Sequence, residues 1–281
     1  MACDVAAGTS VIPRDGGGLH PGALVKRVLS AVVFVPFFLW LLFGWPAALF
    51  SAFVVLLGIR AQWEFSRMFE RDGVAVYPVV GLVLGAAVTA SFQVPGAAPL
   101  VMSAVVVVLM STTLLVSKPP HWAPTALTLL GICYVNWLLG FAIWLRQLPD
   151  GASWIVFLLA VTWSGETAAY LVGSRIGRHR LAPTISPAKT VEGALAQLLS
   201  SILVGGLSGW WLFGSSPAGL VGGLLLGVVG QCGDLAESVL KRSAHTKDTG
   251  ELIPGHGGLL DRLDSLLFNA PALFYYARHI G

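Results

Sequence analysis

The chain has 281 residues, of which 56% are hydrophobic and only 11% charged, and ten are tryptophans. Its mean hydropathy is +0.78, and a soluble domain of this length could not bury so much apolar surface in its core. A formal net charge of +3 is too small to indicate a nucleic-acid partner. Three cysteines without close spacing indicate neither a disulfide framework nor a metal knuckle. These properties predict an all-α polytopic membrane protein.

Residues 1–22 are rich in glycine and lack the basic-then-apolar order of a cleaved signal, so we predict a disordered cytoplasmic tail. Residues 23–281 are predicted to form a single transmembrane domain. Its first part, 23–150, would be a bundle of spans, and its second part, 151–281, would carry the polar motifs described below.

Apolar stretches of the length needed to cross about 30 Å of hydrocarbon predict eight transmembrane spans. In chain order these are 26–44, 46–62, 77–94, 98–117, 123–145, 152–173, 193–214 and 217–240. A ninth apolar stretch, 266–280, is short for a span and contains Pro271. A partly buried ninth segment and an interfacial helix are both left open for it, so eight to nine transmembrane helices are expected.

The distribution of lysine and arginine orients these spans, because positive residues stay on the cytoplasmic side in short loops. With the N-terminus in the cytoplasm, fifteen of the seventeen basic residues fall on the inner side. Only Arg146 and Arg278 fall outside. We therefore predict a cytoplasmic N-terminus.

One group of polar residues follows the sixth predicted span. Lys189, Thr190 and Glu192 stand where the seventh span begins, and the free N–H groups of a helix N-terminus favour phosphate. An ordinary basic loop with a capping signal explains the same residues equally well. Glu166 lies inside the sixth span, where a carboxylate is costly and is usually paired or faces a polar cavity. A structural glutamate is the alternative for this residue.

Acidic residues are concentrated between 234 and 265. Asp234, Glu237, Ser238 and Lys241 follow each other at steps of three, one and three, which places them on one face of a helix continuing the eighth span. A second acidic ridge is predicted on a new helix, where the side chains at i, i+3 and i+4 are Asp261, Asp264 and Ser265.

Two carboxylate ridges next to lysines suit a hard cation such as Mg²⁺, which binds through carboxylates and keeps other positions for phosphates. The segment PGHGG between them supplies turn residues whose backbone can approach a ligand closely. The alternative is a cytoplasmic cap of ion pairs, but surface ion pairs alone stabilise little. The pattern thus favours metal-assisted phosphoryl chemistry.

From Ser238 to Asp264, the sequence SVLKRSAHTKDTGELIPGHGGLLDRLD resembles the signature of the phosphatidate cytidylyltransferase, or CDP-diglyceride synthase, family. The segment AAYLVGSRIGRHRLAPTISPAKTVEG (168–193) is similar to the other cytoplasmic motif of the family, and QWEFSRMF (62–69) also looks like a family segment. One residue departs from the family pattern. Where the family usually carries an aspartate shortly before AAY, this chain has Glu166, in SGETAAY.

The resemblance implies that CTP and phosphatidic acid are converted to CDP-diacylglycerol and pyrophosphate, with Mg²⁺ required. By this resemblance, the expected metal ligands are Asp234, Asp261, Asp264 and Glu237, and the catalytic residues are Asp234, Asp261, Lys241 and Lys189. The expected substrate-binding residues are Arg242, Lys247, Asp248, His256, Gly257, Gly258, Arg262, Ser186, Thr190 and Glu192.

Two other functions are left open by the residues alone. A cation-coupled transporter would also combine many spans with Glu166 and acidic residues, although its charges should gather near the bilayer midplane. A cytidylyltransferase acting on a different lipid phosphate would show the same motifs. The expected location is the inner (plasma) membrane of a bacterium, with the site facing the cytoplasm. A second, monovalent cation and a homodimer are left open as further partners.

Overall fold

The computed structural model describes residues 38–40, 42–116, 121–250 and 258–280, and the chain divides into two compact units, Met1–Gly44 and Trp45–Gly281. In the first unit the described residues are helical. The predicted tail and most of the predicted span 26–44 lie outside the described residues. The site and the packing reported below belong to the second unit.

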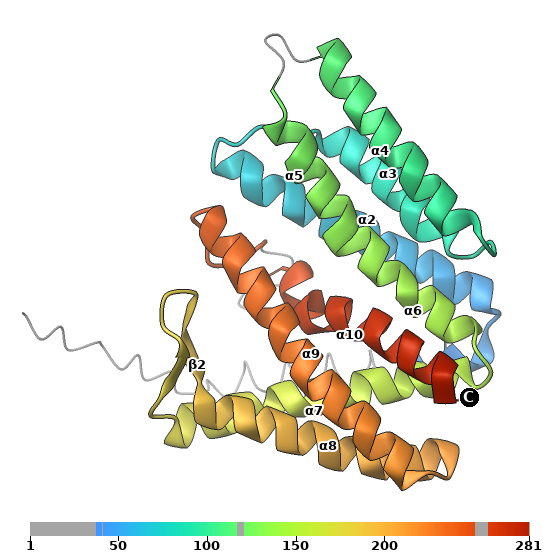
Figure 1. Cartoon of the computed structure of the whole chain (residues 1–281), viewed down its shortest axis with the longest axis vertical. Helices are drawn as coiled ribbons and strands as arrows, with labels where there is room; N and C mark the ends of the chain where they lie inside the picture. Colours follow the sequence, from blue (N-terminus) through green and yellow to red (C-terminus); the bar gives the residue numbers. More distant parts are fainter. Residues whose placement is uncertain (1–37, 41, 117–120, 251–257, 281) are drawn as a thin grey trace, which may run out of the picture. The chain divides into compact units, whose positions relative to one another are not determined.

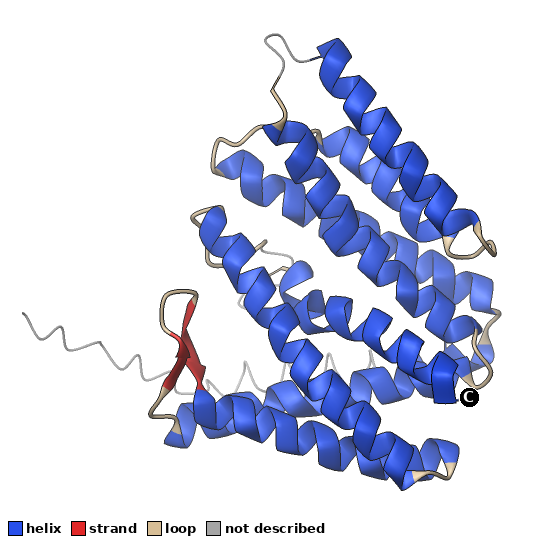
Figure 2. Cartoon of the chain, viewed as in Figure 1, coloured by secondary structure: helices blue, strands red, loops and turns tan. Residues whose placement is uncertain are grey.

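Helices dominate the second unit (Figure 2). They are α2 (Ala47–Arg71), α3 (Pro78–Ser91), α4 (Ala97–Val116), α5 (Ala123–Gly131), the π-helical η1 (Ile132–Trp137), α6 (Leu138–Gln147), α7 (Gly151–Ile176), α8 (Val191–Phe213), α9 (Ser216–Ser243) and α10 (Leu260–Ile280). An antiparallel hairpin of β1 (Arg180–Ala182) and β2 (Ser186–Thr190) stands between α7 and α8. The all-α prediction is confirmed, with this small hairpin as an addition that the apolar periodicity did not indicate.

Among the described residues, six helices are long and apolar enough to cross a membrane. They are Ala47–Arg71, Ala97–Leu115, Ala123–Gln147, Gly151–Ile176, Val191–Phe213 and Ser216–Ser243. The predicted span 77–94 contains α3, which runs from Pro78 to Ser91. With 14 residues, α3 is shorter than the six helices named above. The stretch 266–280 belongs to α10, a 21-residue helix with Pro271 inside it, which is not one of the six. The count of eight to nine spans therefore stays a prediction.

Successive helices pack in pairs, α7 on α8, α8 on α9 and α9 on α10, as Figure 1 shows. Glycines allow α8 and α9 to approach closely. A Cβ added to Gly205 would lie 2.5 Å from the backbone oxygen of Gly219, and one added to Gly209 would lie 2.5 Å from the Cα of Gly219. Small residues at such crossings are typical of membrane helices, where packing rather than burial from water drives association.

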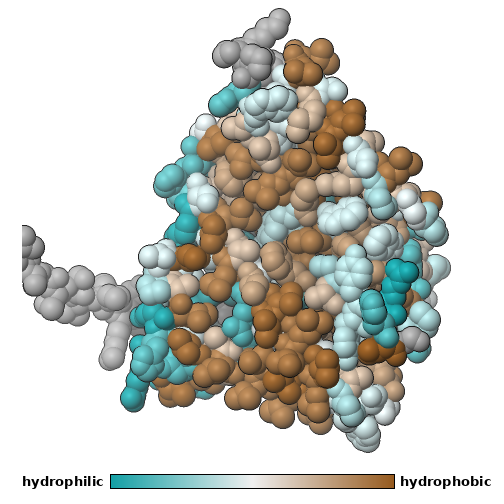
Figure 3. Space-filling view, in the orientation of Figure 1, coloured by the Kyte–Doolittle hydropathy of each residue, from teal (hydrophilic) through white to brown (hydrophobic). Residues whose placement is uncertain are grey.

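Large apolar side chains remain exposed along these helices, and Figure 3 shows them covering much of one face. On α8 the exposed positions recur every four residues, at Leu195, Leu199, Leu203, Leu207 and Trp211. A soluble protein would not leave such a stripe in water. The stripe therefore supports a lipid-facing surface, in agreement with the prediction of an integral membrane protein.

Buried polar contacts join the N-terminal helices. Asn136, in the π-helical turn, donates to Gln62 Oε1 of α2 at 2.9 Å and accepts from Thr89 Oγ1 of α3 at 3.1 Å. All three side chains are fully buried. Hydrogen bonds between buried side chains on different helices fix the positions of those helices. They hold the middle of α2, whose C-terminal half reaches the site described next.

Candidate active site

Three carboxylates meet where α9 crosses α10. One oxygen each of Asp234, Glu237 and Asp264 lies within 4.8 Å of the others. Asp234 and Glu237 are neighbours on α9 because three residues make nearly one helical turn. Gly233 allows α10 to approach, since a Cβ there would lie 2.7 Å from the backbone oxygen of Asp264. We call Asp234, Glu237 and Asp264 the carboxylate cluster.

Two lysines form ion pairs with this cluster from different directions. Lys189 Nζ, at the end of β2, lies 2.8 Å from Asp234 Oδ1. Lys241 Nζ, one turn beyond Glu237 on α9, lies 2.8 Å from Glu237 Oε2 and 2.8 Å from Asp261 Oδ1. The structure thus joins the two polar regions recognised in the sequence, because the hairpin carries Lys189 to the cluster.

Asp261 lies beside the cluster and has a different set of partners. Its Oδ2 accepts from the Thr249 N–H at 3.1 Å, from Thr249 Oγ1 at 2.9 Å and from the Gly258 N–H at 2.8 Å. Burial opposes the charged form, but the hydrogen bond and charge of Lys241 and these N–H donors together lower the pKa of Asp261. An ionised Asp261 therefore ties the described residues on both sides of the segment 251–257 to α10.

The oxygen atoms and the charges of the carboxylate cluster are suited to binding a cation. Glu237 Oε1 is buried and has no hydrogen-bond partner among the described residues. Burial, followed by the charges of Asp234, Glu237 and Glu166, raises the pKa of Asp264 well above its ordinary value. Neighbouring carboxylates that repel each other in this way fit a hard divalent ion with oxygen ligands.

The hairpin that carries Lys189 is fixed by residues predicted to bind substrate. Thr190 caps α8 by accepting from the Gly193 N–H at 3.1 Å. Glu192 accepts from the Arg178 N–H at 3.1 Å, and its Oε1 lies 2.6 Å from His179 Nδ1. The capping interpretation of this segment is confirmed for Thr190. Glu192 thus holds the residues that directly precede β1.

The other predicted substrate-binding residues are spread around the cluster. Arg242 Nε donates to the Ile185 carbonyl at 3.2 Å, next to Ser186 in β2, and so connects α9 with the hairpin. The exposed residues around the following loop and the start of α10 include Lys247, Asp248 and Arg262. Gly258 donates to Asp261, whereas His256 and Gly257 lie outside the described residues.

Glu166, on α7, is partly buried and within electrostatic reach of Asp234 and Arg262. It also lies beside the Ser265 side chain at the start of α10. The carboxylate thus faces the polar region rather than lipid, as an intramembrane charge is expected to do.

One buried carboxylate was given no role in the sequence interpretation. Glu64 of α2 is 2% exposed, pairs with Arg60 at 2.9 Å and accepts from the Leu260 N–H at 2.8 Å. It also accepts from Thr249 Oγ1 at 3.5 Å. The predicted span ended at residue 62, whereas α2 continues to Arg71. Continuing the apolar periodicity through QWEFSRMF would have revealed a charge on a buried helix face.

The comparison with known proteins bears on this geometry. Residues 25–280 match the model of the cytidylyltransferase family. The chain belongs to the cytidylyltransferase family. This match argues against the transporter alternative and covers every element of the site, from Glu64 on α2 to Asp264 on α10.

Individual relatives agree with this family assignment. The chain is 34% identical to a phosphatidate cytidylyltransferase of Synechocystis sp. over 89% of this chain and 95% of the relative. It is 32% identical to a phosphatidate cytidylyltransferase of Bacillus subtilis over 90% of this chain and 95% of the relative. A third, from Staphylococcus haemolyticus, is 36% identical over 59% of this chain and 64% of the relative.

Proposed function

We propose that this cytidylyltransferase acts on CTP and phosphatidic acid and forms CDP-diacylglycerol and pyrophosphate. The observation that carries the proposal is the carboxylate cluster between Lys189 and Lys241, in a chain that matches the family over residues 25–280. Relatives named phosphatidate cytidylyltransferase match nearly the whole chain, which supports the choice of lipid.

Asp234, Glu237 and Asp264 are the residues that would hold Mg²⁺. A divalent ion at this position would offset negative charge on the reacting phosphate and on the leaving pyrophosphate. Lys189 and Lys241 pair with these carboxylates in the structure. Once the carboxylates bind a cation, both ammonium groups would be available to the phosphates of the nucleotide.

The reaction needs no covalent intermediate with the protein. An anionic oxygen of the lipid phosphate attacks the α-phosphorus of CTP, the bond from that phosphorus to the bridging oxygen breaks, and pyrophosphate leaves. Lys189 and Lys241 offset the charge that accumulates during this displacement. Asp261 keeps Lys241 in place through its contact of 2.8 Å, so we assign Asp261 a positioning role beside the predicted metal-binding one.

The active site is proposed to face the cytoplasm of a bacterial inner membrane. The asymmetry of basic residues supports this orientation, because the ends of α7 and α9 that carry the site are rich in lysine and arginine. CTP would then reach the cluster from the cytoplasm while the acyl chains of the lipid stay in the bilayer.

The proposal is tested with purified protein in detergent, CTP, Mg²⁺ and phosphatidic acid, by measuring the release of pyrophosphate. We expect rapid release with phosphatidic acid, and little or no release when phosphatidylglycerol replaces it or when lipid is left out. Pyrophosphate release that is independent of the lipid, or faster with a polyprenyl phosphate, would contradict the choice of phosphatidic acid.

A further inference from the structure

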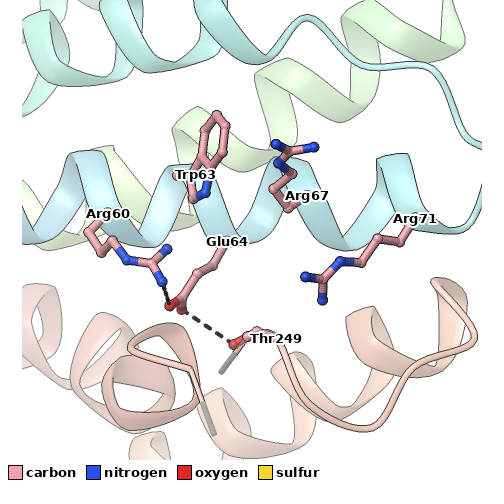
Figure 4. Close-up of a pocket in the computed structure, with 7 residues that line it drawn as sticks. Arg60, Trp63, Glu64, Arg67, Arg71 and Thr249 are labelled. Atoms are coloured by element: carbon pink, nitrogen blue, oxygen red, sulfur yellow. Dashed lines mark hydrogen bonds and ion pairs between the residues drawn. The ribbon is translucent and has the colours of Figure 1, made fainter. Parts of the chain in front are cut away.

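A polar cavity lies on the C-terminal half of α2. It encloses about 370 Å³ and is shown in Figure 4. Its lining combines one face of the helix with the chain before the segment 251–257, through Arg60, Trp63, Glu64, Arg67, Arg71, Thr249 and Gly250. We call it the arginine pocket.

The arginine pocket carries a positive charge that its own residues do not cancel. Glu64 pairs with Arg60 at 2.9 Å, and Arg67 lies over the Trp63 ring at 4.5 Å and 3.6 Å from Glu70. Within the described part of the chain, Arg71 forms no ion pair, and Arg60 Nη1 is buried without a hydrogen-bond partner. Unused guanidinium donors in a cavity are suited to an anion.

We infer that the arginine pocket binds the phosphate of the lipid substrate, an inference that rests on the proposed function. Guanidinium groups recognise phosphate through paired N–H donors of fixed geometry. In Figure 4, Arg60 and Arg71 point to the side of α2 that faces Thr249, where a phosphate would meet both. Glu64 does not repel it strongly, because its charge is taken up by Arg60 and the Leu260 N–H.

The apolar surface of α2 favours a lipid over a nucleotide as the occupant. Leu49, Leu56 and Trp63 are exposed, and they recur every seven residues, which places them on one side of the helix. This stripe spans about 21 Å at 1.5 Å per residue and ends at the Trp63 ring of the pocket. A lipid whose phosphate lies in the pocket could rest its acyl chains along the stripe, whereas CTP has nothing to place there.

A chain of contacts connects the arginine pocket with the carboxylate cluster. Thr249 Oγ1 contacts Glu64 Oε2 at 3.5 Å on the pocket side and Asp261 Oδ2 at 2.9 Å on the cluster side. Lys241 Nζ extends the chain of contacts, because it lies 2.8 Å from Asp261 Oδ1 and 2.8 Å from Glu237 Oε2. The pocket would therefore hold the attacking phosphate next to the site where the nucleotide is activated.

The test uses Arg71→Gln, because Arg71 is exposed and its loss leaves no buried partner behind. We expect the KM for phosphatidic acid to rise about tenfold, as for the loss of one charge-assisted contact, while the KM for CTP changes less than twofold. Arg278→Gln is the matched control, since it removes the same charge from the exposed last turn of α10. It should leave both KM values unchanged. Equal unfolding temperatures would show that the variants are folded.

A rise in the KM for CTP alone, or a fall in kcat with both KM values unchanged, would overturn the inference. A binding experiment without CTP separates it from the proposed function. Purified wild-type protein should retain labelled phosphatidic acid at least about fivefold better than Arg71→Gln, even if no pyrophosphate is ever formed. Competition by glycerol 3-phosphate as strong as that by unlabelled phosphatidic acid would instead indicate a site for free phosphate esters, and would contradict a lipid site.

Discussion

At the residue scale, the carboxylates of this site differ in what neutralises them. Asp234 and Glu237 each contact one lysine, and Asp264 has the two of them as near neighbours. Asp261 and Glu64 also have a basic partner each, Lys241 and Arg60, and they accept backbone N–H groups of residues on either side of the segment 251–257 as well. The carboxylate cluster has three carboxylates for two lysines, one of which also contacts Asp261, and is therefore suited to a cation. Asp261 and Glu64 are satisfied by the protein and are suited to holding structure.

The first prediction concerns Asp264→Asn, which removes one charge from the carboxylate cluster. We expect the Mg²⁺ concentration for half-maximal activity to rise at least about tenfold, because one oxygen ligand becomes neutral. The measurement is pyrophosphate release as a function of Mg²⁺. Asp150→Asn is the control, since Asp150 precedes α7 in a left-handed conformation that asparagine also tolerates. An unchanged Mg²⁺ requirement in Asp264→Asn would contradict the assignment of this ligand.

The second prediction concerns Glu64→Ala. The change leaves Arg60 and the Leu260 N–H without their partner, so we expect a loss of about 2 kcal/mol of unfolding free energy. The loss should be smaller than for a fully buried pair, because the Arg60 side chain is 34% exposed. Thermal unfolding in detergent measures it. Glu70→Ala, which breaks a looser pair of 3.6 Å with Arg67, should cost almost nothing, and equal losses would refute the role of Glu64.

Sequence spacing could predict each acidic ridge, but not how the ridges meet. Asp234, Glu237 and Lys241 share a face of α9 as their spacing requires. Asp264 of α10 completes the cluster, because α9 and α10 approach each other closely at Gly233. Asp261 lies one turn earlier and accepts hydrogen bonds from Thr249 and Gly258. Local periodicity has no information on such a crossing.

At the element scale, the apolar pattern located the helices well but missed structure that depends on polar residues. The start of α8 at Val191 follows from the cap that Thr190 provides. The predicted span 46–62 covers only part of α2, because Glu64 and Arg67 interrupt the apolar run while the helix continues to Arg71. The hairpin between α7 and α8 has three- and five-residue strands, too short for an alternating pattern to be recognised.

The third prediction tests the glycine contacts between α8 and α9. Gly205→Ala places a Cβ 2.5 Å from the rigid backbone oxygen of Gly219, so we expect a loss of about 1–3 kcal/mol. Gly206→Ala meets only the flexible side chain of Leu220, at 2.8 Å, and should cost less than about 1 kcal/mol. Thermal unfolding of the two variants compares neighbouring positions on one helix. A larger loss in Gly206→Ala would contradict this packing.

At the scale of the whole molecule, the orientation in the membrane decides which compartment supplies CTP. The fourth prediction uses α4, whose two ends should lie on opposite sides. Gln93→Cys and His121→Cys place exposed thiols just outside those ends, in chains without the native cysteines. In intact bacterial cells with a permeable outer membrane, a membrane-impermeant maleimide should label the thiol at 93 and spare the thiol at 121. The reverse pattern would contradict a cytoplasmic active site.

The central claim is that the carboxylate cluster serves transfer from CTP to a lipid phosphate. The most direct measurement follows CDP-diacylglycerol and pyrophosphate together, in one reaction of the purified protein with CTP, phosphatidic acid and Mg²⁺. The account predicts equal amounts of both products and the loss of both when Mg²⁺ is chelated. Pyrophosphate without CDP-diacylglycerol, or product formation at the wild-type rate in Glu237→Gln, would contradict it.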